Sequence, residues 1–284
     1  MQKILIQLDT DPAPSTFDRV VAVDAGVEQM FSYGDVTPDT VPALAHGAMF
    51  TRGPKDLHNT AIFIGGSDVE AGEKLLNALE ETFFGPMRVS VLMDSNGSNT
   101  TAAAAVLSAA KHMELKGCEA LILGGTGPVG VRSAQILASQ GALVRVASRS
   151  FERAQQACGT IKQKVPDGQL FPYEFSEEGA AAALDGVQLI IAAGAAGVQF
   201  LSQPEIQELE TLKVAIDVNA VPPAGLQGIE VSDQGEDRNG VICYGAIGVG
   251  GLKMRIHRKA VQQLFETNTQ VLNTAEIYDL GSKV

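Results

Sequence analysis

The sequence predicts an α/β protein, with an N-terminal α/β domain followed by a Rossmann-like domain that binds a dinucleotide. Apolar runs of strand length alternate with segments of helical apolar spacing, and this alternation predicts parallel βαβ units. The pattern restarts after an alanine-rich segment at 99–113. The restart carries "GGTGPVG" at 124–130, directly after a strand-like run. We therefore expect one domain at 1–113, joined by C-terminal helices at 252–284, and a second at 114–251.

Each expected element follows from its local pattern. The first domain is predicted to contain strands at 3–9, 60–66 and 88–94, and helices at 16–27, 68–84 and 99–113. The second is predicted to contain strands at 119–124, 142–147, 187–192 and 213–217, and helices at 128–140 and 150–163. A helix at 252–266 and a short one in "TAEIYDL" complete the chain. The stretch "SDQGEDRNG" at 232–240 is expected to be the longest loop.

Composition excludes several classes of function. The formal net charge of −12 disfavours nucleic-acid and anionic-membrane binding, because both need a basic face. The three cysteines lack C-x-x-C spacing and the four histidines form no close pair, so no disulfide framework or metal site is expected. The start shows no signal sequence, and no apolar stretch reaches the roughly 18 residues of a membrane span. We expect a cytoplasmic protein.

The glycine turn is the first candidate site. Its spacing, Gly125-x-Gly127-x-x-Gly130, opens a predicted helix after a predicted strand. In dinucleotide sites the first glycine allows a tight turn, the second lets the backbone approach the pyrophosphate, and the third lets helix and strand pack closely. The expected cofactor-binding turn also contains Thr126, Pro128 and Val129. The alternative is a tight turn that binds nothing, since this glycine spacing alone is a weak signal.

The end of the second strand of this domain indicates which cofactor binds. NAD sites place an acid there for the ribose 2′-hydroxyl, whereas NADP sites supply arginine and hydroxyl donors for the 2′-phosphate. Here Ser148, Arg149 and Ser150 occupy the position, and no acid appears before Glu152. The sequence therefore predicts NADP, although Arg149 could also be an ordinary solvated residue at a helix start. Further cofactor contacts are expected after later strand ends, from Ala193, Gly194 and Asn219.

Several motifs carry a resemblance to a known family. They are "DTDPAPSTFD" near the start, "DSNGSNTTAAA" at 94–104, "GTGPVG" at 125–130, "NAVPPAGLQGI" at 219–229 and "GAIGVGGLKMRIHR" at 245–258. With these motifs the chain resembles the NADP-dependent methylene-tetrahydromethanopterin dehydrogenases of bacterial one-carbon pathways, some of which also accept methylene-tetrahydrofolate. The similarity extends over essentially the whole chain. It implies a pterin-binding N-terminal domain, a cleft between the two domains, and a homo-oligomer, with a trimer as one form.

The implied reaction moves a hydride from the methylene carbon to the nicotinamide, which leaves a methenyl cation and NADPH. Because no proton is released, the site needs close approach and tolerance of positive charge rather than an obligatory general base. The resemblance places Lys253 at the active site, and Asp18 is the first candidate for an acid that contacts the pterin. Expected substrate contacts are Asp9, Asp11, Asp18, Ser95, Asn96, Ser98, Thr100, Thr101 and Lys253.

Structural alternatives accompany these candidates. Asp18 and Lys253 could be solvated helix charges, and the aspartates or the polar residues at 95–101 could cap turns and helices. Two other functions also remain open. One is a different NADP oxidoreductase that acts on a carbonyl, which needs a proton donor beside the hydride centre, and no Tyr-x-x-x-Lys pair supports it. The other is a non-enzymatic module that senses NADP.

Overall fold

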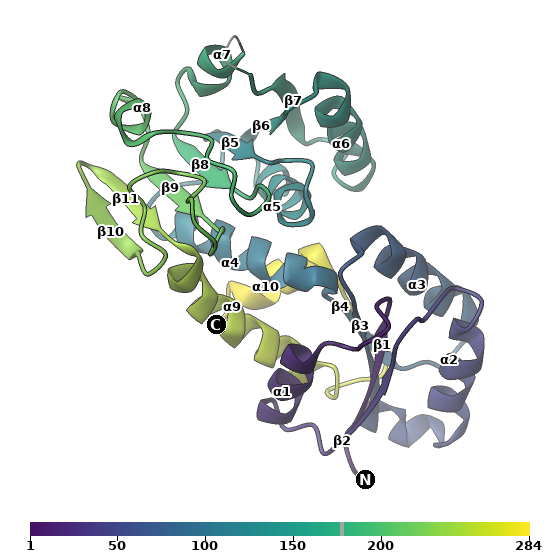
Figure 1. Ribbon diagram of the computed structural model, residues 1–284. Coiled ribbons are helices and arrows are strands. Elements are labelled where there is room, and N and C mark those ends of the chain that lie inside the picture. Colours follow the sequence, from purple (N-terminus) through teal and green to yellow (C-terminus); the bar gives the residue numbers. More distant parts are fainter. Residues whose placement is uncertain (177–178) are drawn as a thin grey trace. The chain divides into compact units, whose positions relative to one another are not determined.

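The computed structural model describes residues 1–176 and 179–284, which form two compact units (Figure 1). Unit 1 comprises Met1–Thr100 and Met254–Val284, and unit 2 comprises Thr101–Lys253. The divisions fall inside two helices, α4 (Ser98–Ala110) and α9 (Ala246–Gln263). The sequence had placed them at 113/114 and 251/252.

Unit 1 is built on a five-stranded sheet in the order β12–β4–β3–β1–β2. Its strands are β1 (Ile4–Asp9), β2 (Gln29–Tyr33), β3 (Thr60–Gly65), β4 (Ser90–Met93) and β12 (Val271–Leu272). Every pairing is parallel, so all the strands end at the same edge of the sheet. The loops that leave this edge carry most of the polar residues expected to bind substrate.

Helices cover both faces of this sheet. They are α1 (Thr16–Asp24), α2 (Val41–Phe50), α3 (Val69–Thr82), α10 (Thr274–Gly281) and parts of α4 and α9, with 3-10 turns η1 (Pro54–Asn59) and η2 (Ser95–Gly97). A buried core joins α2 and α3 to alternate strand residues such as Ile62 and Ile64. On the opposite face His257 of α9 stacks on Phe63, with ring centroids 5.7 Å apart.

Unit 2 holds a seven-stranded sheet in the order β10–β11–β9–β8–β5–β6–β7. Its strands are β5 (Glu119–Leu123), β6 (Leu143–Ser148), β7 (Gln169–Glu174), β8 (Leu189–Ala192), β9 (Val214–Asp217), β10 (Gln234–Arg238) and β11 (Val241–Tyr244). All are parallel except β10, which pairs antiparallel with β11. Numbered along the chain, the parallel strands follow the 3-2-1-4-5-6 order of the doubly wound dinucleotide-binding fold. The predicted α/β class with a Rossmann-like domain is confirmed.

Among the described residues, four helices belong wholly to unit 2: α5 (Pro128–Ser139), α6 (Phe151–Lys164), α7 (Ala180–Leu184) and α8 (Gln203–Gln207). Together with the sheet they enclose a core that includes Leu121, Ile190 and Ala215. These side chains come from the central strands β5, β8 and β9. The centre of the sheet is therefore rigidly packed beneath the loops that leave its carboxyl edge.

The sequence missed several elements, most of them exposed or short. The segment predicted as a loop at 232–240 contains β10, which turns back through Asn239 and Gly240 at φ 57° and 87°. Its residues are charged or polar apart from Gly235 and lie at a sheet edge, so they lack an apolar alternation. Strands β2, β7, β11 and β12 and helix α2 were also missed. The long C-terminal helix, expected from 252, begins at Ala246.

Candidate functional site

The glycine turn connects β5 to α5 at the point where the chain connections of the sheet change direction. Gly124 adopts φ 70°, and the N–H of Gly127 donates to its carbonyl at 3.0 Å. Gly127 is the N-cap of α5, and Pro128 follows at its first position. Strand β5 lies between β6 and β8, so this turn occupies the topological switch point, where doubly wound sheets bind their ligands.

The three glycines of the motif have different surroundings. A Cβ on Gly130 would lie 2.5 Å from the carbonyl oxygen of Gly124, and one on Gly125 would lie 2.8 Å from Val146 Cγ1. The fold itself therefore requires both glycines. A Cβ on Gly127 would approach nothing closer than the Gly124 oxygen at 3.4 Å, which is ordinary contact. Packing of the protein therefore does not explain why residue 127 is a glycine.

The loop after β8 approaches the same turn. A Cβ on Gly124 would lie 2.5 Å from the Cα of Gly194, and a Cβ on Gly194 would clash with the ring of Phe200. Ala193 is buried, and its N–H continues the ladder by donating to the carbonyl of Leu123 at 2.8 Å. The predicted residues Ala193 and Gly194 thus lie beside the glycine turn. Phe200 was missed because an isolated aromatic residue in a loop gives no pattern.

The end of β6 presents one free cationic side chain among the described residues. Ser148 is the last strand residue and is buried, whereas Arg149 is exposed and has no described partner. Ser150 is the N-cap of α6, and its Oγ accepts from the N–H of Arg153 at 3.4 Å. Ser150 therefore has a structural role at the start of the helix, whereas Arg149 lies exposed at the end of the strand.

Asn219 shapes the loop after β9. Its Oδ1 accepts from the N–H of Val221 at 3.0 Å, and it lines a pocket of about 310 Å³ together with Pro222 and Pro223. The strand ends at Asp217, whose carboxylate accepts from the N–H groups of Asn219 and Leu226, each at 2.9 Å. Burial raises the pKa of Asp217 above its usual value, against these hydrogen bonds. This carboxylate holds the loop that carries Asn219.

In unit 1, the aspartates after β1 are bound within the protein. Asp9 is 1% exposed, and its carboxylate accepts from the N–H groups of Asp11 at 2.9 Å and Ser15 at 3.1 Å. Asp11 is partly exposed and accepts from the N–H and the hydroxyl of Ser67, at 3.0 and 2.8 Å. Asp9 is thus placed to hold the loop, whereas Asp11 lies at its surface and joins it to the loop after β3.

The polar cluster after β4, residues 95–100, also contains buried residues that bond within the protein and one residue that is exposed. Ser95 and Ser98 are buried and donate their hydroxyls to backbone carbonyls, and the hydroxyl of Thr100 donates to the buried Asp94 at 2.6 Å. Asn96 alone among residues 95–100 is exposed, and it adopts φ 55°, an uncommon conformation for a residue with a side chain. The following residue, 101, belongs to unit 2. Strained, exposed residues of this kind cluster at ligand sites.

The exposed polar residues of unit 1 come from neighbouring loops. The N–H of Asn96 donates to the carbonyl of Gly66 at 2.7 Å, and the next residue, Ser67, bonds to Asp11. Asn96 and Asp11 therefore lie at the same edge of the sheet. Asp18 is half-buried in the first turn of α1, and its N–H donates to Ser15 Oγ at 3.3 Å.

The other two substrate candidates belong to unit 2. Thr101 is half-buried in α4. Lys253 is half-buried in the third turn of α9, because that helix starts earlier than expected. Two glycines at its start fit against a loop of the same unit: a Cβ on Gly245 or Gly248 would clash with the backbone of Glu230 or Asp233. This packing explains why a glycine-rich segment forms the start of α9, which places Lys253 in the third turn of the helix.

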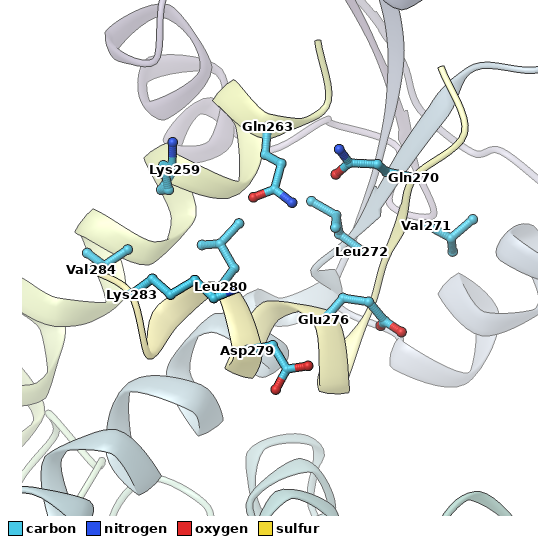
Figure 2. A pocket seen from close by; sticks show the side chains of 10 residues that line it. All are labelled: Lys259, Gln263, Gln270, Val271, Leu272, Glu276, Asp279, Leu280, Lys283 and Val284. Atoms are coloured by element: carbon cyan, nitrogen blue, oxygen red, sulfur yellow. The ribbon is translucent and has the colours of Figure 1, made fainter. Parts of the chain in front are cut away.

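A second cavity lies elsewhere in unit 1. It measures about 350 Å³ and is lined by α9, β12 and α10, with Gln263 and Gln270 among the lining side chains (Figure 2). None of the predicted site residues lines it. Among the described residues, no three or more His, Cys, Asp or Glu side chains are grouped so that they could hold a metal ion. In the same part of the chain, we find no helix with the length and apolarity to cross a membrane.

The strand order and the glycine turn together define a doubly wound, dinucleotide-binding type of protein. A family model described as "Methylene-tetrahydromethanopterin dehydrogenase, N-terminal" matches residues 16–96. Two proteins of Methylorubrum extorquens are similar over nearly their whole length. "Bifunctional protein MdtA" is 41% identical, covering 100% of this chain and 99% of the relative, and "NAD(P)-dependent methylenetetrahydromethanopterin dehydrogenase" is 32% identical, covering 95% and 94%. The chain belongs to the methylene-tetrahydromethanopterin dehydrogenase family.

Solved structures with low sequence identity share the fold. Ligand-free 5-ketofructose reductase of Gluconobacter sp. strain CHM43 matches with a TM-score of 0.57 at 15% identity, covering 100% of this chain and 99% of that one. Quinate dehydrogenase from Corynebacterium glutamicum, in complex with NAD, matches with a TM-score of 0.53 at 10% identity and the same coverage. At these identities the similarity concerns architecture alone.

Proposed function

We propose that this protein is an NADP-dependent dehydrogenase that oxidises methylene-tetrahydromethanopterin, and also methylene-tetrahydrofolate, to the methenyl form. The observation that carries the proposal is Gly127, whose missing side chain is explained by a ligand at the switch point and not by packing. The name of the relative that is 32% identical and the description of the matching family model support the reaction and its pterin substrate. In this proposal unit 2 holds the cofactor and unit 1 contributes most of the substrate contacts.

The residues of unit 2 fit a nicotinamide dinucleotide. The turn at 124–130 would hold the pyrophosphate through backbone N–H groups at the start of α5, and Gly194 lies directly beside this turn. Arg149 would bind the 2′-phosphate, because a guanidinium matches phosphate oxygens in a bidentate way. Asn219, in the loop after β9, is assigned to the nicotinamide end. When bound, NADP supplies the hydride acceptor.

The residues of the chain would orient the pterin and tolerate the positive charge that develops as the hydride leaves. We assign Asp11, Asp18 and Asn96 to the pterin, because each is at least partly exposed at or near the carboxyl edge of the unit 1 sheet. A carboxylate near the reacting carbon stabilises the developing cation. Asp9, Ser95, Ser98 and Thr100 then act by holding these loops, and Thr101 and Lys253 complete the proposed substrate contacts.

The proposal includes a cytoplasmic homo-oligomer, for which a trimer is one form. Light scattering coupled to size-exclusion chromatography gives the mass in solution. A monomeric mass would contradict the homo-oligomer but would leave the catalytic proposal intact, since the residues proposed for cofactor binding all lie in one unit.

A direct assay tests the proposed reaction. Purified protein is mixed with NADP and either methylene-tetrahydromethanopterin or methylene-tetrahydrofolate, and formation of NADPH and of the methenyl product is followed by absorbance. We expect equal amounts of both products. Binding of NADP without turnover on either pterin would instead favour a sensing module, and turnover on a carbonyl substrate alone would favour a different oxidoreductase.

A further inference from the structure

Glu152 lies at the β6–α6 turn, two residues beyond the N-cap of α6. Its Oε2 accepts the hydroxyl hydrogen of Ser150 at 2.6 Å, while Ser150 Oγ accepts the N–H of Arg153 at 3.4 Å. A serine hydroxyl has a single hydrogen to donate. The hydroxyl expected to serve a 2′-phosphate is therefore already committed to a carboxylate.

The carboxylate of Glu152 is ionised at neutral pH. The Ser150 hydroxyl, followed by the backbone N–H of Glu152 itself, holds the pKa of the carboxyl below its usual value. A negative charge thus lies at the helix start, where a 2′-phosphate would use the same donors. It is three residues from Arg149, the cation proposed to attract that phosphate.

We propose that Glu152 is a selectivity residue, which weakens binding of NADP and permits binding of NAD at the same turn. This inference rests on the proposed function in one respect, namely that the end of β6 receives the adenosine ribose. A carboxylate near the ribose hydroxyls is an acceptor that suits NAD, and it repels the 2′-phosphate of NADP. Arg149 and Glu152 act in opposition, so their balance sets the preference between the two cofactors.

Replacing Glu152 by Gln tests this balance. Dissociation constants for NADPH and NADH are measured from their fluorescence on binding, in wild type and Glu152→Gln, without any pterin. We expect tighter NADPH binding, by about fivefold or more, because one charge ~4–6 Å from a phosphate dianion in water-like surroundings is removed. NADH binding should be unchanged or weaker. The NADPH effect should shrink in high salt, since exposed charges are screened.

Glu70→Gln is the matched control. Glu70 occupies the same position after the N-cap of α3, a helix of 14 residues like α6, and it lies in unit 1. The control changes net charge equally, and neither dissociation constant should move. Equal tightening of NADPH and NADH in Glu152→Gln, or the same NADPH shift in Glu70→Gln, would overturn the inference. Failure of the proposed reaction is distinguishable, because it appears as absent pterin turnover while both cofactors can still be titrated.

Discussion

Gly130 packs so closely against Gly124 that a methyl group at Gly130 would lie 2.5 Å from the Gly124 carbonyl oxygen. Close packing between helix α5 and the end of β5 is what places the start of the helix beside the switch point. Gly127, between them in the chain, has no such neighbour. The turn therefore contains glycines that the fold requires and one glycine, Gly127, for which we propose a ligand-binding role.

Alanine substitutions should separate these two roles. Gly130→Ala should lower the free energy of unfolding by about 1–3 kcal/mol, because the added methyl overpacks a rigid backbone contact. Gly127→Ala should stay within about 1 kcal/mol of wild type, since φ −80° and ψ 168° suit alanine. It should nevertheless weaken NADP binding about tenfold or more. Urea unfolding and fluorescence titration measure the two effects, and unaltered binding in Gly127→Ala would contradict the proposed phosphate turn.

Asn96→Gly should affect substrate binding and not folding. Glycine accepts φ 55° readily, so the free energy of unfolding should change by less than about 1 kcal/mol. Loss of the exposed amide should raise the Michaelis constant for the methylene pterin several-fold, with little change for NADP. The matched control is Asn239→Gly, which has φ 57° and lies exposed in the β10–β11 turn. A similar Michaelis constant for wild type and Asn96→Gly would remove Asn96 from the substrate site.

The ion pair between Arg238 and Asp233 should make stability depend on pH. Asp233 is 4% exposed and receives two hydrogen bonds of 2.7 Å from the guanidinium. Burial acts to raise the pKa of Asp233, but the arginine and the N–H of Glu230 outweigh it, so the pKa lies below its usual 3.8. A lowered folded-state pKa gives stability that is present above the unfolded-state pKa and is lost as pH falls through the folded-state value.

Arg238→Gln should therefore lower the free energy of unfolding by about 1–3 kcal/mol at pH 7, because it leaves a buried carboxylate without its cation. Near and below pH 4 the difference from wild type should narrow, since the carboxyl in the variant takes up a proton. Urea unfolding of wild type and Arg238→Gln at pH 7 and at pH 4 measures the difference in the free energy of unfolding. An equal deficit at both would show that the guanidinium acts through packing and not through charge.

Central elements of the fold were predictable from the sequence, and edge elements were not. Strand β5 is short and uniformly apolar, so its pattern was unambiguous, whereas β10 is charged and depends on pairing with β11. The start of α9 was missed because helix propensity disfavours its glycines. Contact of Gly245 and Gly248 with the backbone of Glu230 and Asp233 fits the helix start at this place, and the local sequence gives no signal of such contact.

The candidate site shows the same limit. The spacing of polar residues after strands located the loops, but it did not tell exposed side chains from buried ones. Ser95 and Asn96 are adjacent and chemically similar, yet one donates to the Gly65 carbonyl and the other faces solvent. The two residues also differ in backbone conformation, because Asn96 is left-handed and Ser95 is not. A backbone conformation set by tertiary contacts cannot be inferred from residue type alone.

The last prediction concerns Lys253 and the fate of the methenyl product. Loss of a hydride creates a cation, which an ammonium at ~4 Å would destabilise by roughly 1–4 kcal/mol, depending on the local dielectric constant. Lys253 should therefore be paired with an acid or held away from the reacting carbon during the reaction. We expect Lys253 to orient the pterin. Lys253→Ala should therefore lower the turnover number and leave NADP binding nearly unchanged.

Lys259→Ala is the control for this variant, since Lys259 lies in the same helix, is about half-exposed, and lines the separate cavity of Figure 2. It should retain the wild-type turnover number. We also expect the wild type to release the methenyl product without hydrolysing it, because a site built for hydride transfer needs no activated water. An unchanged turnover number in Lys253→Ala would make Lys253 a surface charge. Enzyme-dependent decay of methenyl absorbance would show that the protein also catalyses hydrolysis.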